Sequence, residues 1–279
     1  MDGIRIYRTT LGPIAEEGAC FYKLPVTWAD LLHAEAPLTL VQELLKGAEQ
    51  VMAPSHSSIE MPMTEQQELW SCGVTYKRSR DGRQEESKEA GGSDFYARVY
   101  EAERPEIFMK ASAARVVGTG NLVRIRKDSS WNVPEPELTL VVNSNGAIIG
   151  YTIGNDMSSR SIEGENPLYL PQAKTYDGCA ALGPCILLTP DETISSSTTI
   201  QLVIKRAGLP VFSDTVALTQ MKRGLKELVG FVYRECSFPF GCFIMTGTGI
   251  VPPPSFTLLA GDLVEIEISG IGTLTNIVA

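Results

Sequence analysis

Residues 135–177 read EPELTLVVNSNGAIIGYTIGNDMSSRSIEGENPLYLPQAKTYD, and this stretch carries most of what the sequence predicts about the fold. Two runs rich in Val, Ile and Leu, at 138–143 and 147–153, are typical of buried strands. Asn143-Ser-Asn-Gly146 between them is a strong signal for a hairpin turn. Six ionisable residues follow: Asp156, Arg160, Glu163, Glu165, Lys174 and Asp177. So many charges after a buried strand indicate a functional loop, although a solvated surface loop has the same composition.

Paired carboxylates precede the first of these strands. Glu135 and Glu137 are two residues apart in extended backbone, so both side chains point to the same side. Carboxylates that close repel each other unless a cation or a proton lies between them. With Asp156 across the hairpin, three oxygens could face one hard divalent cation such as Mg²⁺. Ordinary surface alternation is the other interpretation of the Glu-x-Glu pair taken alone.

Composition narrows the class of protein. The 279 residues carry a net charge of −9, which argues against a nucleic-acid partner because such a protein needs a basic face. No apolar run approaches the length of a membrane span. The opening residues MDGIRIYRTT do not have the order of a signal peptide. The six cysteines are scattered without a C-x-x-C pair, so we expect a reduced, cytoplasmic protein without a membrane partner.

The first 63 residues predict a small α/β N-terminal domain. Strands are expected at 4–8 and 19–23 around a Gly12-Pro13 turn, and helices at 28–34, behind Thr27, and at 40–46. A Pro-rich stretch ends this unit near residue 63. The remainder, 64–279, is then a β-rich main domain, and the fold class is α+β.

Two helices and a lid are expected next. Thr64 and Gln67 have the spacing of a capping box, which predicts a helix running towards Trp70. The polar stretch 74–92 indicates a mobile loop or lid, or plain disorder. A helix should follow at 93–100. Further along, the pattern predicts strands at 122–126, 184–188, 199–205 and 262–268 and a helix at 220–233.

No nucleotide-binding motif is present, and neither His33 nor His56 belongs to a zinc or nucleophile motif. Thr246-Gly-Thr-Gly249 is a Gly-rich turn that could present N–H groups to an anion or be an ordinary tight turn. The sequence therefore favours a metal-based chemistry over a nucleotide cofactor.

Three ordered segments resemble one known family. PEPELTLVVN, GYTIGNDMSSRSIEGENPLYLPQAKTYDGCAALGP and FIMTGTGIVPPPSFTLLAGDLVEIEISGIGTLTN are similar to the C-terminal domain of the fumarylacetoacetate hydrolase family. The resemblance covers about residues 70–279. It implies a mixed β-roll, a homodimer or homotetramer, and a Mg²⁺ (or Mn²⁺) site on Glu135, Glu137 and Asp156. It also places the family's active-site lysine on Lys174 and a substrate-binding threonine on Thr248.

The composition of the predicted lid narrows the choice of reaction. Hydrolytic members of this family carry a histidine paired with a glutamate in the lid to activate water. Residues 74–89 contain Arg78, Arg80, Glu85 and Glu86 but no histidine. This difference, with the ENPLYLPQAK run, makes the chain resemble the members that dehydrate 2-keto-3-deoxy sugar acids. A dehydration needs no activated water.

The chemistry expected from this resemblance is dehydration of a 2-keto-3-deoxy pentonate to 2,5-dioxopentanoate. A 2-keto acid chelates Mg²⁺, which acidifies the C3 protons and stabilises the enolate. Lys174 could act as the base or stay charged beside the enolate oxygen. Glu85 or Glu86 could protonate the leaving hydroxyl, and Arg78 or Arg80 could bind distal oxygens or be solvated charges.

Two alternatives remain open from the sequence. The same site could hydrolyse an acylpyruvate or fumarylacetoacetate-like diketo acid, or decarboxylate a β-keto acid. A non-catalytic relative that uses the fold for assembly or ligand binding is the other alternative. Retention of the three acidic residues and Lys174 counts against it.

Overall fold

The hairpin predicted at residues 138–153 is the central element of the fold. The computed structural model describes residues 3–86, 93–190 and 193–279. Strands β10 (Pro136–Val142) and β11 (Ile148–Asp156) pair antiparallel, with Glu137 opposite Gly154. The Asn143 side chain accepts hydrogen bonds from the backbone N–H groups of Asn145 and Ala147, each at 3.0 Å, and closes the turn. Every residue of both strands is buried, so neighbouring strands and sheets cover them on both faces.

Strands from both ends of the chain extend this hairpin into one large sheet. In the part of the chain that the structure describes, the strands lie side by side in the order β4 (Glu49–Val51), β3 (Cys20–Lys23), β2 (Ile14–Glu17), β1 (Ile4–Tyr7), β13 (Ala180–Leu188), β11, β10, β16 (Cys242–Met245), β5 (Glu68–Gly73) and β6 (Glu106–Ser112), with β7 (Val116–Val117) also paired to β13.

A second, smaller sheet packs against the first. Its order is β15 (Leu209–Ala217), β14 (Thr199–Arg206), β17 (Leu263–Ile268), β18 (Gly272–Val278) and β8 (Leu122–Val123), and β9 (Asn132–Val133) pairs separately with β12 (Ser158–Ser159). Leu138 and Leu140 of β10 share one hydrophobic cluster with Leu202 and Ile266 of the smaller sheet. Val141, which points to the opposite face, belongs to a second cluster. The main core therefore lies between the two sheets.

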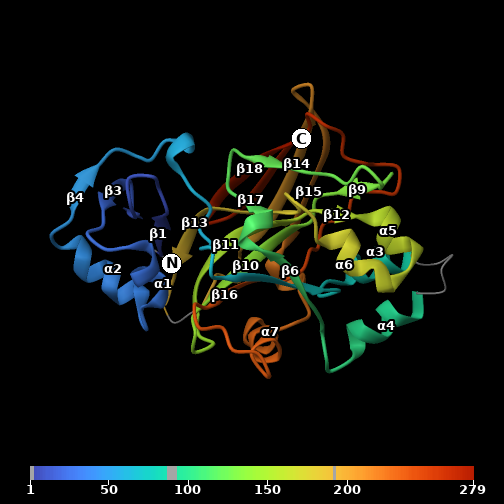
Figure 1. The fold of residues 1–279 in the computed structure, drawn as a ribbon, viewed down its shortest axis with the longest axis horizontal. Helices are drawn as coiled ribbons and strands as arrows, with labels where there is room; N and C mark the ends of the chain where they lie inside the picture. The colour runs from blue at the N-terminus through green and yellow to red at the C-terminus, as the bar shows by residue number, and fades with distance from the viewer. Residues whose placement is uncertain (1–2, 87–92, 191–192) are drawn as a thin grey trace.

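The helices cover different flanks of the sheets, as Figure 1 shows. In the described residues they are α1 (Trp28–His33), α2 (Pro37–Leu45), α3 (Lys77–Glu86), α4 (Ser93–Glu101), α5 (Arg160–Glu165), α6 (Leu170–Lys174) and α7 (Leu225–Val232). α1 and α2 lie with the N-terminal strands at the left of the view, and α3 to α6 gather at the right. None of the helices among the described residues has the length and apolar character of a membrane span.

The N-terminal unit is built as expected but is joined closely to the rest. Both predicted helices are present, and the Thr27 hydroxyl accepts from the Asp30 N–H at 3.1 Å as a helix cap. An additional strand, β2, lies between the two predicted strands. β1 pairs with β13, Ile4 opposite Leu188, so the N-terminal strands continue the catalytic sheet. The division at residue 63 stays a proposal.

The helix predicted from Thr64 towards Trp70 was wrong. The side-chain Oε1 of Gln67 does accept the Thr64 N–H at 2.9 Å, but this pair closes only one turn. The chain then enters β5, which lies between β16 and β6. Strand pairing on both sides satisfies more backbone groups than a short surface helix could, so tertiary context overrides the local signal.

The polar stretch 74–92 is not a structureless loop in its described part. Residues 77–86 form α3, and the Ser79 hydroxyl bonds the backbone of Tyr76 at the first turn. Arg, Lys, Gln and Glu are good helix formers. The high charge of this stretch had instead indicated a loop. Residues 87–92 lie outside the described residues.

The helix predicted at 220–233 begins later than expected. α7 starts after Gly224, whose N–H donates to the Glu227 side chain at 3.1 Å. Met221 instead forms an isolated β-bridge with Tyr76. Sheet-like pairing at that point excludes the first predicted turn.

Candidate metal centre

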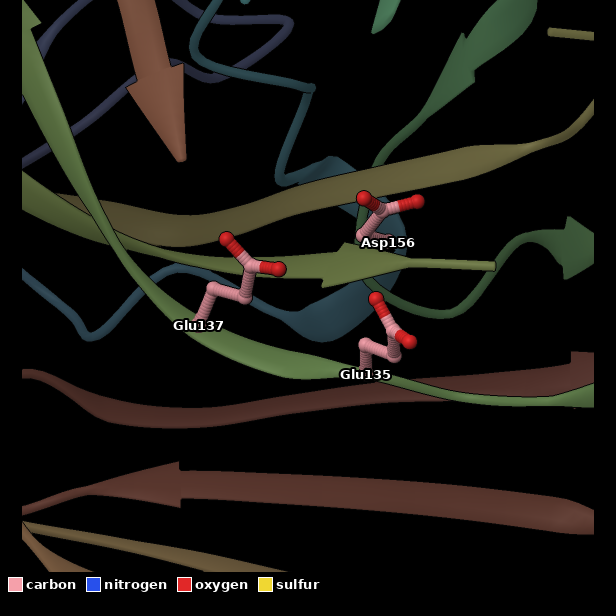
Figure 2. A group of neighbouring side chains, drawn as sticks. All are labelled: Glu135, Glu137 and Asp156. Carbon is pink, nitrogen blue, oxygen red and sulfur yellow. The ribbon is translucent and has the colours of Figure 1, made fainter. Parts of the chain in front are cut away.

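Three carboxylates meet where β10 and β11 lie together. Glu135 precedes β10, Glu137 lies within it, and Asp156 ends β11. Their ligand oxygens all lie within 4.8 Å of one another, and the three residues are 4%, 2% and 1% exposed. Figure 2 shows the side chains projecting towards one another from the two strands. The i, i+2 spacing and the hairpin register therefore bring together the residues that the sequence singled out.

Glu137 is the member of this group without a cationic partner. Among the described residues its carboxylate accepts one hydrogen bond, from the Gly247 N–H at 2.5 Å, and forms no ion pair. Burial, and then the negative charges of Asp156 and Glu135, raise its pKa well above the ordinary value. A divalent cation would relieve this repulsion, and oxygen ligands suit Mg²⁺. The donor set fits that metal.

Lys174, at the end of α6, lies against the same carboxylates. Its Nζ is 2.6 Å from Glu135 Oε2 and 3.2 Å from Asp156 Oδ2, and it contacts Ser158 Oγ at 2.5 Å. Burial opposes the charge, but Asp156, Glu135 and Glu163 outweigh it and raise the pKa of Lys174. The amine is therefore charged in this arrangement.

Asp156 is held by two lysines. Lys110 Nζ lies 2.6 Å from its Oδ1, while Lys174 approaches Oδ2. Burial favours the neutral acid, but the two ammonium groups outweigh it and lower the pKa of Asp156. The pKa values of Asp156 and Glu137 are therefore shifted in opposite directions, although the two carboxylates are neighbours.

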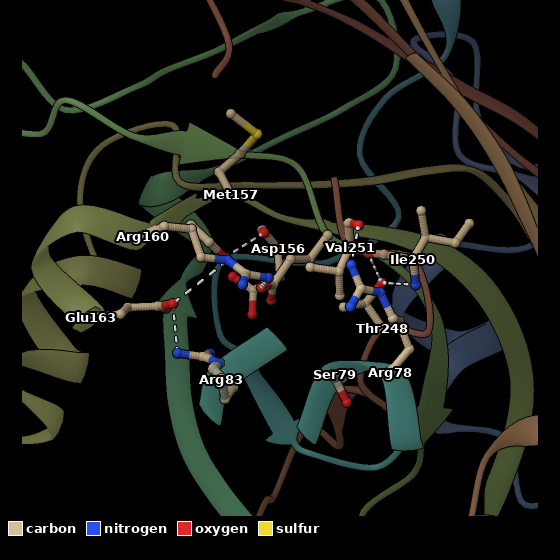
Figure 3. Close-up of polar contacts among 12 residues, drawn as sticks. Arg78, Ser79, Arg83, Asp156, Met157, Arg160, Glu163, Thr248, Ile250 and Val251 are labelled. Atoms are coloured by element: carbon tan, nitrogen blue, oxygen red, sulfur yellow. Dashed lines mark hydrogen bonds and ion pairs between the residues drawn. The ribbon is translucent and has the colours of Figure 1, made fainter. Parts of the chain in front are cut away.

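A second layer of ion pairs links α3 to α5. Arg83 of α3 reaches Glu163 of α5 at 2.5 Å, and Arg160 donates to Glu135 at 2.6 Å. Figure 3 shows Arg83 and Arg160 converging on Glu163 below Asp156. All three of these residues are almost fully buried. The predicted lid segment is therefore fastened to the carboxylate site by charge pairs.

A small cavity of about 10 Å³ lies at the centre of these groups, about the room that one water molecule needs. Thr248 lines it, as expected from the resemblance, and its hydroxyl accepts the Ile250 N–H at 3.2 Å. From α3, the residues at the cavity are Ser79 and Arg83. A five-carbon acid needs more room than this.

Of the other charged residues predicted on the lid, Arg78, Arg80 and Glu85 do not line this cavity. Arg80 donates to the neighbouring Asp81 at 2.6 Å and lies over the Tyr100 ring. Arg78 is exposed and donates to the Val251 carbonyl at 3.4 Å. Glu85 is exposed, and the side chain of Glu86 lies outside the described part of the structure. Their predicted roles stay proposals.

Sequence reasoning passed over three residues near the centre: Lys110, Arg83 and Glu106. Lys110 is a charged residue inside the apolar run Phe108-Met-Lys-Ala111, which is a usable signal for a buried functional lysine. Burial raises the pKa of Glu106 despite Arg83 and Lys174 nearby, and its Oε2 is shielded from solvent. Nothing local separates Arg83 from the other arginines of α3.

The fold and its buried carboxylate centre define a metal-binding enzyme of mixed β architecture. Residues 81–279 match the model of the fumarylacetoacetate (FAA) hydrolase C-terminal domain. The chain belongs to the fumarylacetoacetate hydrolase family, which confirms the resemblance read from the sequence.

Two relatives with 44–47% identity to this chain are named as dehydratases. The chain is 47% identical over 210 residues to a probable 2-keto-3-deoxyxylonate dehydratase of Haloferax volcanii, covering 75% of this chain and 71% of that protein. It is 44% identical over 208 residues to the 2-dehydro-3-deoxy-D-arabinonate dehydratase of Saccharolobus solfataricus, covering 74% and 70%. A solved structure of 2-keto-3-deoxy-D-arabinonate dehydratase complexed with magnesium and 2,5-dioxopentanoate superposes with a TM-score of 0.81 at 33% identity, covering 100% of this chain and 98% of that one.

Proposed function

We propose that this protein is a Mg²⁺-dependent hydro-lyase that converts a 2-keto-3-deoxy pentonate into 2,5-dioxopentanoate in sugar-acid catabolism. The observation that carries the proposal is the buried group Glu135, Glu137 and Asp156, in a chain 44–47% identical to dehydratases of such acids. Mn²⁺ is the alternative metal, because it accepts the same oxygen ligands.

Glu135, Glu137 and Asp156 are the proposed metal ligands. When bound, Mg²⁺ would polarise the 2-keto group and stabilise the negative charge that develops as the C3 proton leaves. The protein contributes the fixed position of the carboxylates at the end of a hairpin and their burial in a small cavity. Both make electrostatic stabilisation stronger than it is in water.

Lys174 has two possible roles, and the structure favours one of them. A general base must be neutral before it takes a proton, yet the surrounding carboxylates raise the pKa of this amine. As a charged group it would donate a hydrogen bond to the developing enolate oxygen. The base role would require binding of the metal to draw Glu135 and Asp156 away from the lysine.

Departure of the C4 hydroxyl needs a proton donor. Glu85 or Glu86 would serve if α3 rotates when substrate binds. Glu106 is a second candidate, because burial raises the pKa of its carboxyl group and Gly73, which lines the cavity, leaves room for it. Glu85→Gln, Glu86→Gln and Glu106→Gln assayed side by side would separate them, since only loss of the true donor abolishes turnover.

Distal oxygens of the substrate would be bound from α3 and the Gly-rich turn. Arg83, Ser79 and Thr248 already line the cavity. Arg78 and Arg80 would join them only if the helix moves. The absence of histidine from residues 74–89 leaves the lid without a water activator, which favours dehydration over hydrolysis of an acylpyruvate.

The decisive experiment is a mass-spectrometric product assay with a small panel of 2-keto-3-deoxy acids, acylpyruvates and β-keto acids, each with Mg²⁺ and with EDTA. We expect loss of one water from a 2-keto-3-deoxy pentonate, in the presence of Mg²⁺ alone. Full activity after removal of metal by EDTA would refute the metal-dependent mechanism. Turnover of an acylpyruvate or a β-keto acid instead would establish one of the alternative reactions.

We propose a homodimer or homotetramer in the cytoplasm. The proposal rests on the family resemblance, and the structure describes a single chain; Leu168 and Leu209, which are 83% and 70% exposed, are the apolar residues to test at an interface. Light scattering coupled to size exclusion measures the assembly directly, and a monomeric mass at micromolar concentration would contradict it. Fractionation of the source cells tests the compartment.

A further inference from the structure

Lys110 is a fully buried charge that the proposed reaction does not use. It lies in β6 with 0% of its surface exposed, and it is not among the residues that line the cavity. An ammonium group taken out of water is costly unless it is paired and hydrogen-bonded. Its position next to the carboxylate centre therefore needs a physical reason.

Every donor of this ammonium group has a partner. Lys110 Nζ lies 2.6 Å from Asp156 Oδ1, donates to the Met157 carbonyl at 2.9 Å, and donates to the Lys174 carbonyl. A lysine ammonium has three N–H donors and no acceptor. None is left over for a substrate, so this lysine acts through the groups that it holds.

These three contacts join the two parts of the site. Asp156 ends β11, Met157 follows it directly, and the Lys174 carbonyl ends α6. A second bond runs in the same place, from the Thr175 hydroxyl to the Lys110 carbonyl at 3.0 Å. β6 therefore fixes the spacing between the proposed metal ligand and the active-site lysine.

The contact to Asp156 also holds the orientation of its carboxylate group. Oδ1 is held by Lys110, while Oδ2 lies 3.2 Å from Lys174 and 3.3 Å from the Ser71 hydroxyl. Without Lys110 the carboxylate could rotate about its terminal bond, because such torsions are broad. The ammonium group of Lys110 therefore orients the ligand as well as neutralising it.

We propose that Lys110 is a positioning residue that orients Asp156 for the metal and sets its distance from Lys174, without touching the substrate. The inference rests on the proposed function, because it presumes a metal on Asp156. Metal affinity then depends on a residue of β6, a strand that is far from β11 in the sequence.

The experiment compares Lys110→Met with the unmodified protein and with Lys205→Met as a matched control. Lys205 makes a comparable single ion pair, to Glu265 at 2.6 Å, but lies on the smaller sheet. Mg²⁺ affinity is measured by titration calorimetry, Mn²⁺ coordination by electron paramagnetic resonance, and the fold by circular dichroism. Substitution of groups that orient metal ligands weakens metal binding by about 10- to 100-fold, and we expect a loss in this range for Lys110→Met alone.

Further readouts separate positioning from general stability. The Mn²⁺ spectrum of Lys110→Met should change, and at saturating metal kcat should fall while the substrate KM changes little. Lys110→Gln keeps two N–H donors and serves where Lys110→Met does not fold, with an intermediate loss expected.

Two outcomes would overturn separate statements. If the unmodified protein does not bind Mg²⁺, the proposed function fails. If it binds Mg²⁺ and folded Lys110→Met or Lys110→Gln binds as tightly with an unchanged Mn²⁺ spectrum, the role of Lys110 is refuted while the proposed function stands.

Discussion

Glu137 and Asp156 are carboxylates of the same centre with opposite environments, and they should respond differently to the same kind of substitution. Among the described residues Glu137 forms no ion pair, so Glu137→Gln removes the repulsion from Asp156 and Glu135 without breaking one. We expect this variant to lose Mg²⁺ binding and turnover with no loss of thermal stability. Calorimetric titration with Mg²⁺ and a thermal melt measure both.

Asp156→Asn removes the same function at a structural cost. It removes the carboxylate that pairs with Lys110 and one of the carboxylates that pair with Lys174. Breaking a buried pair costs about 3 kcal/mol or more. We expect a clear drop in the free energy of unfolding, measured by urea denaturation. Equal stability of the two variants would mean that the lysines find other partners.

The raised pKa of Glu137 predicts how the stabilisation by Mg²⁺ depends on pH. The folded chain without metal holds a proton that the unfolded chain releases above about pH 4.3, so this group lowers stability progressively as the pH rises towards its folded pKa. Mg²⁺ binds the ionised form and removes this penalty. We expect the gain in Tm produced by saturating Mg²⁺ to increase as the pH rises above the unfolded pKa of about 4.3 towards the raised folded pKa, with proton release on binding.

The Mg²⁺ increment is the appropriate readout because other groups act in the opposite direction. Asp156 has a lowered pKa, so its contribution to stability is present above its unfolded pKa and is lost on acidification. Measuring Tm with and without Mg²⁺ cancels such common terms. An increment independent of pH, or the same increment in Glu137→Gln, would contradict the assignment.

At the scale of single residues, the sequence predicts that side chains on one strand or one hairpin lie close together. Glu135 and Glu137 follow from a spacing of two residues, and Asp156 from the register of one turn. Lys110 and Arg83 reach the centre from β6 and α3, through contacts that no local spacing encodes. They were missed for that reason.

At the scale of elements, close packing of three strands supports the centre. A Cβ at Gly154 would lie 2.3 Å from Thr139 Oγ1 and 2.8 Å from the Met245 side chain. Gly154→Ala should therefore force β11 away from β10 and β16, at a cost of about 1–3 kcal/mol, and weaken Mg²⁺ binding at Asp156. Chemical denaturation and Mg²⁺ titration measure the two effects.

Gly230→Ala is the matched control for that substitution. A Cβ there meets nothing within 4 Å, and the residue lies inside α7. Alanine in a helix interior should stabilise by about 0.5–1 kcal/mol and leave Mg²⁺ binding unchanged. A similar loss in both variants would remove the packing argument.

The position of α3 predicts which of its arginines contributes most to activity. Arg83 forms the buried pair with Glu163, whereas Arg78 and Arg80 are bonded outside the cavity. Arg83→Met should lower kcat/KM by about two orders of magnitude, as loss of one partner of a buried pair does. Steady-state kinetics with Arg78→Met and Arg80→Met test the sequence-based assignment, and a larger loss at either would show that α3 rotates to bind substrate.

Elements were predictable where local and tertiary preferences agree. The hairpin of β10 and β11 and the cap of α1 carry their own turn chemistry. At residues 64–70 the capping pair is present, but the segment lies between two strands and becomes β5. In α3 the charge pattern indicated a loop because its partners on α5 are not visible in the sequence.

At the scale of the whole molecule, the N-terminal strands are part of the catalytic sheet. β1 and β13 are far apart in sequence, yet Ile4 lies opposite Leu188 and Ile6 opposite Ile186. Ile4, Ile6, Leu31 and Val41 share a hydrophobic cluster with residues of β10, β11 and β13. No pattern within residues 1–63 reveals that its core continues into the other domain.

This continuity predicts that residues 64–279 do not form an independent unit. Removal of residues 1–63 would expose the free edge of β13 and the apolar face that α1 and α2 cover, and such an edge pairs readily with other chains. We expect the fragment to aggregate or to melt at least about 10 °C below the intact protein, a shift that corresponds to several kcal/mol. Light scattering and thermal melts of both chains measure this. A monodisperse fragment that binds Mg²⁺ as tightly as the intact protein would instead establish the boundary at residue 63 as a true domain boundary, with β1 an addition to a sheet that is already complete.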